Sequence, residues 1–269
     1  YVDENGKVVL VGEDVPRFDH DPDTGECKGL LVEGERRNYI PNGIRPGDKW
    51  TGSKANSTWT ENTTETTAPD GTYTATKWAF TGTDPYLYHQ QTLNAGVTYT
   101  LSMWVKAGTN MSGDWVQFRI GGAPYSIQTN CIIPTDGTWR RITYTKTIGG
   151  SNETNVNVGF EPQTSPSGNP ASGDVIYVWG AQLESGTTAS SFIPTYGYTQ
   201  MRGADVATIE GEEFTEWYND LEGTIFTSHS VNSDVADNSS SYVLEIGDAG
   251  STHVAFRLQD VNNSFSNKP

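Results

Sequence analysis

The chain has few basic residues, few cysteines and no long hydrophobic run. Lysine and arginine together number 17 against 33 aspartates and glutamates, and cysteine occurs twice in 269 residues. Cys27 and Cys131 are too few for a secreted disulfide scaffold, so we expect two reduced, unlinked thiols. No stretch approaches the ~18 apolar residues of a membrane span, which predicts no membrane insertion.

The net charge of −16 restricts the classes of partner. Proteins that bind nucleic acid carry a basic stripe, whereas the longest basic run in this chain is Arg36-Arg37. Nucleic acid is therefore not an expected partner, and neither is an anionic membrane surface. Neutral sugars and other proteins remain as candidates.

Aromatic residues are abundant although hydrophobic residues make up only 34% of the chain. Eight Trp, thirteen Tyr and nine Phe indicate a folded chain, because disordered segments are poor in aromatic residues. This composition, with much Thr, Asn and Gly, is typical of a thin β-sandwich core under a polar surface. The chain begins at Tyr1 without a signal-like stretch, and we expect it to be part of a longer protein.

Short strands separated by turn signals such as Asp70-Gly71 and Asp136-Gly137 fill the region from Trp50 to Pro194. Eight antiparallel strands at this spacing predict a jelly roll, in which two sheets stack on an apolar interior. The predicted strands are Thr72–Thr81, Tyr86–Gln91, Val97–Lys106, Asp114–Ile120, Ser126–Thr129, Thr138–Thr147, Asn155–Phe160 and Asp174–Leu183.

Alternation within these strands assigns residues to the two faces of a sheet. In Val97–Lys106, Met103 belongs to the apolar face and Trp104 to the opposite face. Asp114–Ile120 alternates in the same way, and its outward residues are Trp115, Gln117 and Arg119.

Two further patterns concern the later strands. The alternation slips by one residue between Trp139 and Tyr144, which predicts a β-bulge there. Asp174–Leu183 is apolar on both faces, as expected of a central strand that is covered on both sides. We assign Trp139, Trp179 and Tyr177 to the core.

Residues 1–46 predict an extended arm with two β-hairpins. The first hairpin places Lys7–Val11 after the Glu4-Asn5-Gly6 turn, and in the second, strand-like runs flank the turn DPDTGE, where Gly25 suits a left-handed conformation. The arm has too little apolar material for its own core, so it must pack on a neighbour, for example another copy of the chain. The charged segment Glu33–Asn38 predicts a connector to a separate domain.

The end of the chain predicts a connector and a second β module. Glu212–Leu221 has aromatic residues at helical spacing, which predicts a helical turn. Strands are expected at Glu222–Phe226, Tyr242–Ile246 and Val254–Gln259. The fold class is therefore all-β, with an N-terminal arm of hairpins (1–46), an eight-stranded antiparallel jelly-roll sandwich (47–195), a connector (196–221) and a partial second β-sandwich (222–269).

The segment Pro16–Ile40, PRFDHDPDTGECKGLLVEGERRNYI, resembles the linker ahead of the receptor-facing modules in tail-fibre and related virion proteins of tailed bacteriophages. Asp23 occupies the variable position of that pattern. The resemblance departs at Arg37-Asn38-Tyr39, where the family commonly has Arg-Thr-Asn.

Four later motifs resemble the jelly-roll carbohydrate-binding-module superfamily in its phage-fibre version. They are Ala68–Thr72, Ala95–Lys106, Gly137–Arg141 and Val178–Glu184 with Ser190–Thr195. The region after Pro194 resembles the opening of a concanavalin-A-like lectin domain, which needs roughly three times the residues present here.

These resemblances imply a structural and adhesive component of a virion appendage, such as a tail fibre, spike or capsid fibre, that is assembled in the bacterial host cytoplasm. The implied partners are other virion proteins, copies of the chain itself in a homotrimer, and a host-surface glycan. Two alternatives stay open. One is a purely architectural module without sugar binding, and the other is the non-catalytic part of a polysaccharide depolymerase.

No motif supports catalysis or metal binding. Glycosidases need two carboxylates about 5 to 9 Å apart, and the nearest acidic run, Glu245-Ile246-Gly247-Asp248, has the wrong spacing. The sequence contains no nucleophile elbow, no phosphate-binding glycine loop and no zinc-binding histidine pair. Asp19–Gly25 lacks the glycine and glutamate positions of a calcium loop, and Asp174 is the only match to the calcium ligand that the resemblance implies. We expect no enzyme activity, no cofactor and no metal.

The candidate functional residues are aromatic and planar polar side chains. Sugar rings stack their C–H faces on Trp and Tyr, and sugar hydroxyls need planar donors and acceptors. Trp104 or Trp115 could instead pack under the arm, a loop or a partner subunit. The predicted carbohydrate-binding residues are Trp104, Trp115, Gln117, Arg119, Tyr86 and Tyr88.

Overall fold

The structure is a computed structural model that describes residues 1–46, 50, 54–121, 131–164, 168–219, 221–230, 240–248, 251–261 and 264–265. The chain divides into two compact units, Tyr1–Ala207 and Thr208–Pro269. The predicted strand Ser126–Thr129 lies outside the described residues.

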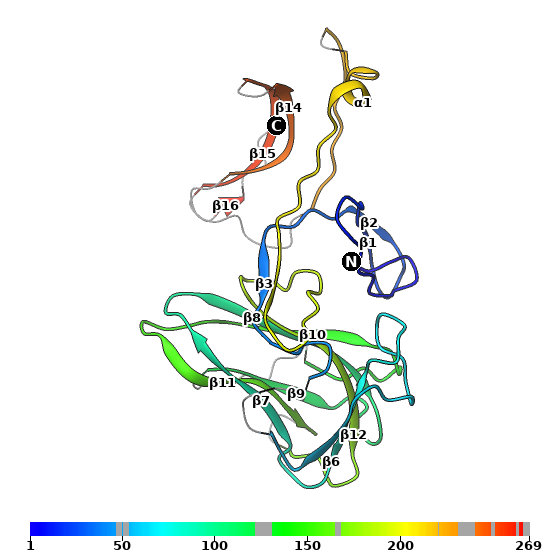
Figure 1. The fold of residues 1–269 in the computed structure, drawn as a ribbon, viewed down its shortest axis with the longest axis vertical. Coiled ribbons are helices and arrows are strands. Elements are labelled where there is room, and N and C mark those ends of the chain that lie inside the picture. The colour runs from blue at the N-terminus through cyan, green and yellow to red at the C-terminus, as the bar shows by residue number, and fades with distance from the viewer. Residues whose placement is uncertain are drawn as a thin grey trace. The chain divides into compact units, whose positions relative to one another are not determined.

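Two antiparallel sheets form a β-sandwich in the first unit (Figure 1). Its strands are β4 (Lys54–Ala55), β5 (Ser57–Thr60), β6 (Thr76–Phe80), β7 (Tyr86–Leu93), β8 (Thr98–Ala107), β9 (Trp115–Ile120), β10 (Arg140–Thr147), β11 (Glu153–Gln163) and β12 (Val175–Ser185). One sheet has the order β10-β8-β12-β6-β5, and the other has the order β4-β7-β11-β9. The predicted all-β fold class is confirmed.

The strands β6 to β12 correspond to seven of the eight predicted strands. The short strands β4 and β5 were not predicted, because Ser, Thr and Asn dominate this stretch and leave no apolar alternation. Strand β5 nevertheless forms one edge of the five-stranded sheet, where it pairs with β6. The ring of Trp59 on β5 stacks on that of Trp78 on β6, with centroids 4.4 Å apart.

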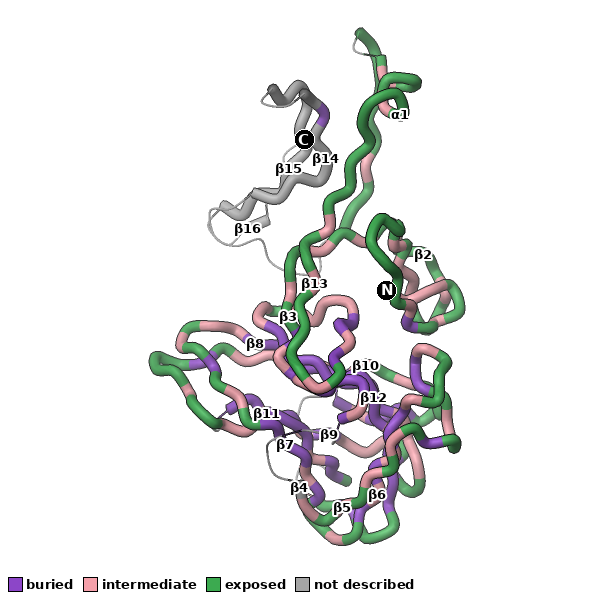
Figure 2. Tube along the Cα trace, viewed as in Figure 1, coloured by how far each residue is buried: buried purple, intermediate pink, exposed green. Residues whose placement is uncertain are grey.

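The apolar core lies between the two sheets, where Figure 2 shows the buried residues gathered. Strand β9 follows the predicted alternation, because Val116, Phe118 and Ile120 are buried while the residues between them are partly exposed. Each large side chain buried in this way contributes about 1.5–3 kcal/mol. Tyr177, predicted to be core, is only partly buried, and its hydroxyl donates to Glu65 Oε2 at 2.7 Å.

The bulge predicted between Trp139 and Tyr144 is wrong. Strand β10 pairs with β8 without a shift from Arg140 to Thr147. Trp139 precedes the strand and points to the opposite side from the main core, where its indole N–H donates to the Thr67 carbonyl at 2.8 Å. Because Trp139 was assigned to the core, its position on the outer side made the alternation look shifted by one residue.

The bulge lies instead in β12, where the register with β8 shifts between Trp179 and Gln182. Gly180 has a φ of +67° there, and a Cβ at this position would lie 2.7 Å from the Trp104 ring. The fully buried Asn38 fills the bulge: its amide nitrogen donates to the Ala181 carbonyl at 3.2 Å, and its amide oxygen accepts from the Leu183 N–H at 3.2 Å.

Glu33–Asn38, the segment predicted as a charged connector, is therefore part of the first unit and contacts its sandwich. Strand β3 (Arg36–Asn38) pairs antiparallel with β13 (Gln200–Arg202), so the chain entering the sandwich lies against the chain leaving it. Tyr39 continues the contact, because its N–H donates to the Leu183 carbonyl of β12 at 2.8 Å.

The two predicted arm hairpins are present. Val2 bridges Val8 in the first, and β1 (Phe18–His20) pairs with β2 (Cys27–Leu30) in the second. Gly25 has the expected left-handed φ of +70°. The first hairpin packs on the chain's own sandwich: Val8 is buried, and its N–H donates to the Pro69 carbonyl at 3.0 Å.

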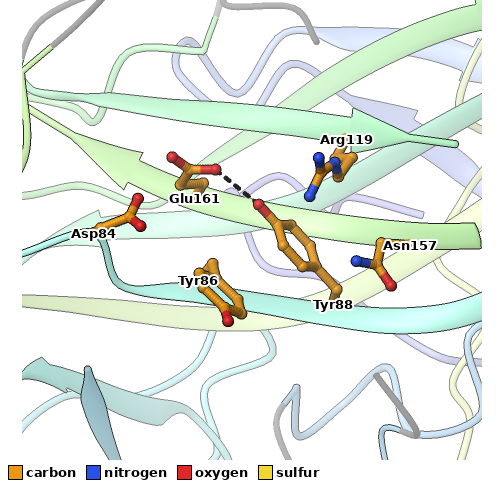
Figure 3. A pocket seen from close by; sticks show the side chains of 6 residues that line it. All are labelled: Asp84, Tyr86, Tyr88, Arg119, Asn157 and Glu161. Carbon is orange, nitrogen blue, oxygen red and sulfur yellow. Dashed lines mark hydrogen bonds between the residues drawn. The ribbon is translucent and has the colours of Figure 1, made fainter. Parts of the chain in front are cut away.

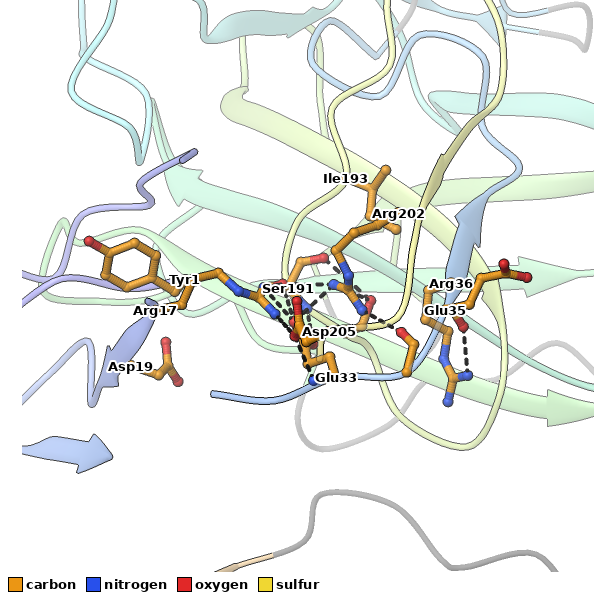
Figure 4. Close-up of polar contacts among 12 residues, drawn as sticks. Tyr1, Arg17, Asp19, Glu33, Glu35, Arg36, Ser191, Ile193, Arg202 and Asp205 are labelled. Atoms are coloured by element: carbon orange, nitrogen blue, oxygen red, sulfur yellow. Dashed lines mark hydrogen bonds and ion pairs between the residues drawn. The ribbon is translucent and has the colours of Figure 1, made fainter. Parts of the chain in front are cut away.

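A partly buried polar cluster, called the clasp below, joins the arm to the segment after the sandwich (Figure 4). It consists of Arg17, Glu33, Ser191, Arg202 and Asp205. The Glu33 carboxylate lies 2.7 Å from the Arg17 guanidinium and 2.9 Å from that of Arg202, and Arg17 also pairs with Asp205. Burial by itself would raise the pKa of Glu33, but hydrogen bonds from Ser191 and the two guanidiniums outweigh it and leave this pKa below its ordinary value.

The second unit contains α1 (Gly211–Thr215) and an antiparallel sheet of β14 (Ser240–Asp248), β15 (Ser251–Val261) and β16 (Ser264–Phe265). The strands predicted at Tyr242–Ile246 and Val254–Gln259 are confirmed. The strand predicted at Glu222–Phe226 is wrong: the segment is irregular, and Phe226 is 90% exposed. Helix α1 is shorter than predicted, although Phe214 stacks on Tyr218 with centroids 4.6 Å apart.

Candidate functional site

Trp104 does not belong to an exposed surface. It points outward from the five-stranded sheet, as predicted, but is only 8% exposed and packs on Trp179 and Phe192 with ring centroids 5.4 and 5.5 Å away. The guanidinium of Arg141 lies 4.4 Å from the centre of its ring. The prediction that Trp104 shares a face with Trp115 is wrong, because β8 and β9 lie in different sheets. The alternative, that Trp104 packs under a covering segment, is confirmed.

The other five predicted residues share the outer face of the four-stranded sheet. In this sheet β11 lies between β7 and β9 and aligns their residues: Gly159 pairs with Tyr88 on β7 and with Arg119 on β9. Successive side chains of a strand point to opposite faces, so every second residue joins this face. The residues of the face are Tyr86 and Tyr88 from β7, Asn157, Glu161 and Gln163 from β11, and Trp115, Gln117 and Arg119 from β9.

Tyr88 is a buried residue that packs between the side chains of Tyr86 and Arg119. Only 3% of this residue is exposed, and its ring lies so close to β11 that a Cβ at Gly159 would be 2.7 Å from Tyr88 Cδ1. The Tyr86 ring stacks on it at 5.0 Å, nearly parallel, and the Arg119 guanidinium lies 4.9 Å from its centre. Figure 3 shows Tyr86 and Arg119 on opposite sides of the ring. Both ring faces are therefore occupied, which leaves the Tyr86 ring as the aromatic face on which a ligand could stack.

The Tyr88 hydroxyl orients the carboxylate of Glu161. It donates to Glu161 Oε2 at 2.7 Å, while Gln163 Nε2 donates to Glu161 Oε1 at 3.0 Å. Burial raises the pKa of Tyr88 far above its ordinary value, and the hydrogen bond to Glu161 adds to this effect. The hydroxyl consequently remains a proton donor at neutral pH, and both oxygens of Glu161 are held in place.

A hollow of about 220 Å³ opens beside these side chains and is lined by Asp84, Tyr86, Tyr88, Arg119, Asn157 and Glu161. Figure 3 shows that its two ends differ: Asp84 and Glu161 lie on one side of Tyr88, and Arg119 and Asn157 lie on the other. The hollow is smaller than the ~300–1,000 Å³ pockets that enclose drug-sized ligands, so it suits one small ring.

Sequence reasoning missed Asp84, Asn157, Glu161 and Gln163. The predicted strand ended at Phe160, whereas β11 continues to Gln163, so Glu161 was placed in a loop. The alternation Asn157, Gly159, Glu161 was the available signal. Asp84 precedes β7 with a φ of +60°, a turn conformation that carries no functional signature.

This arrangement provides what a sugar ring requires: an aromatic face, carboxylate acceptors, and amide and guanidinium donors. Within the described ranges, no group of three His, Cys, Asp or Glu residues is placed to hold a metal ion. The same part of the chain contains no helix of the length and apolarity needed to cross a membrane.

No family model and no curated protein matches the chain. Among solved structures, it is similar to the enzymatically active domain of tailspike protein 4 from bacteriophage CBA120, with a TM-score of 0.35 and 14% identity over 55% of this chain and 21% of that one. A carbohydrate-binding module of Cellvibrio mixtus lichenase 5A, solved in complex with cellotriose, gives a TM-score of 0.29 and 16% identity over 55% of this chain and 98% of that one.

A cyclase from a Fischerella species in its apo form gives a TM-score of 0.34 and 12% identity over 70% of this chain and 96% of that one. These likenesses include enzymes as well as a binding module, and at such scores and identities they carry no argument about function.

Proposed function

We propose that the outer face of the four-stranded sheet binds a host-surface glycan, and that the chain is a non-enzymatic part of a bacteriophage virion appendage. The observation that supports glycan binding is the Tyr86 ring stacked beside a polar hollow whose carboxylate is held by Tyr88. The virion assignment is supported by the sequence resemblance of Pro16–Ile40.

The binding surface extends beyond the hollow. Trp115 pairs with Gln163, and Gln117 pairs with Glu161, so a strip of planar polar groups ends in a partly exposed indole. Trp115 lies four residues from Arg119, which at ~3.4 Å per residue corresponds to about 14 Å. The strip therefore offers room for further sugar units on the Trp115 side of the hollow, as an oligosaccharide requires.

The strip also contains an unused acceptor. Gln163 is only 6% exposed, and its Oε1 is buried without a hydrogen-bond partner. A buried acceptor without a donor costs about 1–3 kcal/mol, so a rotation of Gln163 on ligand binding that brings this oxygen to a ligand hydroxyl or amine would remove the cost. Weak binding at each site would suffice in an oligomeric appendage, because linked copies raise the effective concentration.

A glycan array probed with the full chain tests this proposal, followed by titration of each bound glycan against Tyr86→Ala. Loss of the stacking platform should weaken binding by about tenfold. Tyr73→Ala is the matched control, because Tyr73 is 57% exposed and lies outside the site. Unchanged affinity in Tyr86→Ala would place the binding surface elsewhere.

The architectural alternative is supported by the hairpin β1–β2, where the cross-strand pair Phe18 and Leu30 is 51% and 49% exposed. Exposed apolar pairs of this kind are typical of protein contacts. An array without any bound glycan would favour this alternative. Release of reducing ends from a glycan that binds would instead favour a depolymerase.

A further inference from the structure

We propose that the hollow takes a sugar unit carrying a protonated amino group, with Asp84 and Glu161 as the specificity-determining residues. This inference rests on the proposed glycan binding and names the class of sugar that the site selects.

The charges that line the hollow are unequal and separated. Two carboxylates, those of Asp84 and Glu161, lie at the end nearer Tyr86, whereas the guanidinium of Arg119 lies beyond Tyr88 (Figure 3). Tyr88 lies between them: its hydroxyl donates to Glu161 and also interacts with Arg119, whose guanidinium packs 4.9 Å from the centre of the ring. A ligand group at the acidic end consequently faces two carboxylates.

The acidic end is built to accept hydrogen bonds. Both oxygens of Glu161 are fixed, by the Tyr88 hydroxyl at 2.7 Å and by Gln163 Nε2 at 3.0 Å, so their remaining lone pairs have a set direction. An ammonium group offers three donors and a positive charge, and charge-assisted hydrogen bonds to carboxylates are about twice as strong as neutral ones.

The aromatic ring favours the same ligand. Tyr86 lines the hollow beside the carboxylates, and the face of a tyrosine ring attracts a cation. At the other end, Arg119 and Asn157 supply donors for the oxygens of the sugar. A neutral sugar satisfies this second end equally well, so the selection for an amine comes from the acidic end.

Acidic sugars are disfavoured by the same charges. A ligand carboxylate would meet Asp84 and Glu161 in the hollow and would approach a chain whose net charge is −16. The long-range part of this repulsion is screened beyond about 8 Å at physiological salt, whereas the contact within the hollow is screened much less.

Saturation-transfer NMR with the full chain and single sugars tests the inference. The probes are glucosamine, glucose, N-acetylglucosamine and glucuronate, and the corresponding galactose series. Glucosamine or galactosamine should bind about fivefold more tightly than its neutral parent, since partly exposed charge pairs give small gains. N-acetylation, which removes the charge and keeps the bulk, should abolish this preference.

Variants identify the residues responsible. Glu161→Gln and Asp84→Asn should each reduce the preference for the amine toward unity, measured within each variant as the ratio of its affinities for the amino sugar and for the neutral parent. Glu13→Gln is the control, because it removes one negative charge from an exposed position outside the site. It should leave the preference unchanged.

The inference is overturned if a uronate binds as well as the amine, if no amino sugar binds, or if the preference survives both site variants. These outcomes are separate from failure of glycan binding itself. Array glycans that bind through Tyr86 without any amine preference would overturn only the selectivity, whereas an array without any bound glycan would remove both proposals.

Discussion

Both sheets of the sandwich carry aromatic residues on their outer faces, but these residues are buried on one sheet and partly exposed on the other. On the five-stranded sheet, Trp104 and Trp179 are buried under Val8 of the arm and Phe192 of the segment after β12. On the four-stranded sheet, Tyr86 and Trp115 stay partly exposed beside a polar hollow. An outward aromatic residue is therefore a binding candidate only where no remote segment of the chain covers it.

The covered face depends on contacts between segments far apart in the sequence. Arg17 and Glu33 come before the sandwich, whereas Ser191 and Arg202 come after it, and the clasp joins them. The strand pair β3–β13 reinforces this junction. Covering the five-stranded sheet thus requires both ends of the first unit at once.

Replacing the buried Trp104 should have the largest effect on stability. Trp104→Ala removes an indole that packs on Trp179, Phe192 and the Arg141 guanidinium, which should cost about 3–5 kcal/mol of unfolding free energy. Trp115→Ala removes a partly exposed indole and should cost less than about 1 kcal/mol. Urea unfolding followed by far-UV circular dichroism measures both values.

The same pair separates stability from binding. Trp115→Ala should weaken binding of an oligosaccharide, whereas any Trp104→Ala protein that remains folded at low temperature should bind it normally. Equal stability losses in the two variants would contradict the difference between a covered and an exposed face.

Opening the clasp should uncover the five-stranded sheet. Glu33→Gln leaves the guanidiniums of Arg17 and Arg202 without their shared carboxylate. It should cost about 2 kcal/mol, less than the ~3–5 kcal/mol of a fully buried pair, because the groups retain some water contact. Quenching of tryptophan fluorescence by acrylamide should increase as the cover over Trp104 loosens. Glu13→Gln serves as the exposed control. Unchanged quenching would mean that the arm is held without the clasp.

The clasp also predicts a pH dependence. Hydrogen bonds and guanidiniums hold the pKa of folded Glu33 below its ordinary value of 4.5, so the unfolded state binds the proton more readily. The resulting stability is fully present above about pH 4.5 and is lost as the pH falls through the lower pKa of the folded state. Urea midpoints measured from pH 7 to 3 should therefore fall less steeply for Glu33→Gln than for the unchanged chain.

The sequence was sufficient for strands β6 to β12 of the sandwich and for most of their faces. Apolar alternation located Val116, Phe118 and Ile120 correctly, because a residue's own neighbours in the strand determine which side it faces. The order of strands within a sheet has no such local signal. Trp104 and Trp115 lie on consecutive strands, β8 and β9, yet the chain crosses to the other sheet between them.

Alternation within single strands also made part of the site recognisable from the sequence. Tyr86, Tyr88, Gln117 and Arg119 follow from alternation in two strands that β11 brings together. Glu161 was missed because β11 runs past Phe160, and the support role of Tyr88 depends on its ring contacts with Tyr86 and Arg119. Contacts across strands require the register, which the sequence of one strand does not contain.

The smallest expected effect on stability comes from removing either of two similar tyrosine–glutamate hydrogen bonds, one on each sheet. Tyr88 donates to Glu161, and Tyr177 donates to Glu65, each at 2.7 Å. Burial and the bond to Glu65 raise the pKa of Tyr177 to about 12, so both hydroxyls stay protonated at neutral pH. Tyr88→Phe and Tyr177→Phe should each cost about 1 kcal/mol or less of unfolding free energy, the usual net value of such a bond.

Only Tyr88→Phe should change glycan binding, because it releases the carboxylate that lines the hollow. We expect about a threefold loss of affinity by calorimetric titration, since Gln163 still holds the other oxygen of Glu161. Equal affinities for the two variants would show that orienting Glu161 does not matter for recognition. A loss in Tyr177→Phe alone would move the binding surface to the five-stranded sheet, because Glu65 and Lys77 form the neighbouring polar pair there.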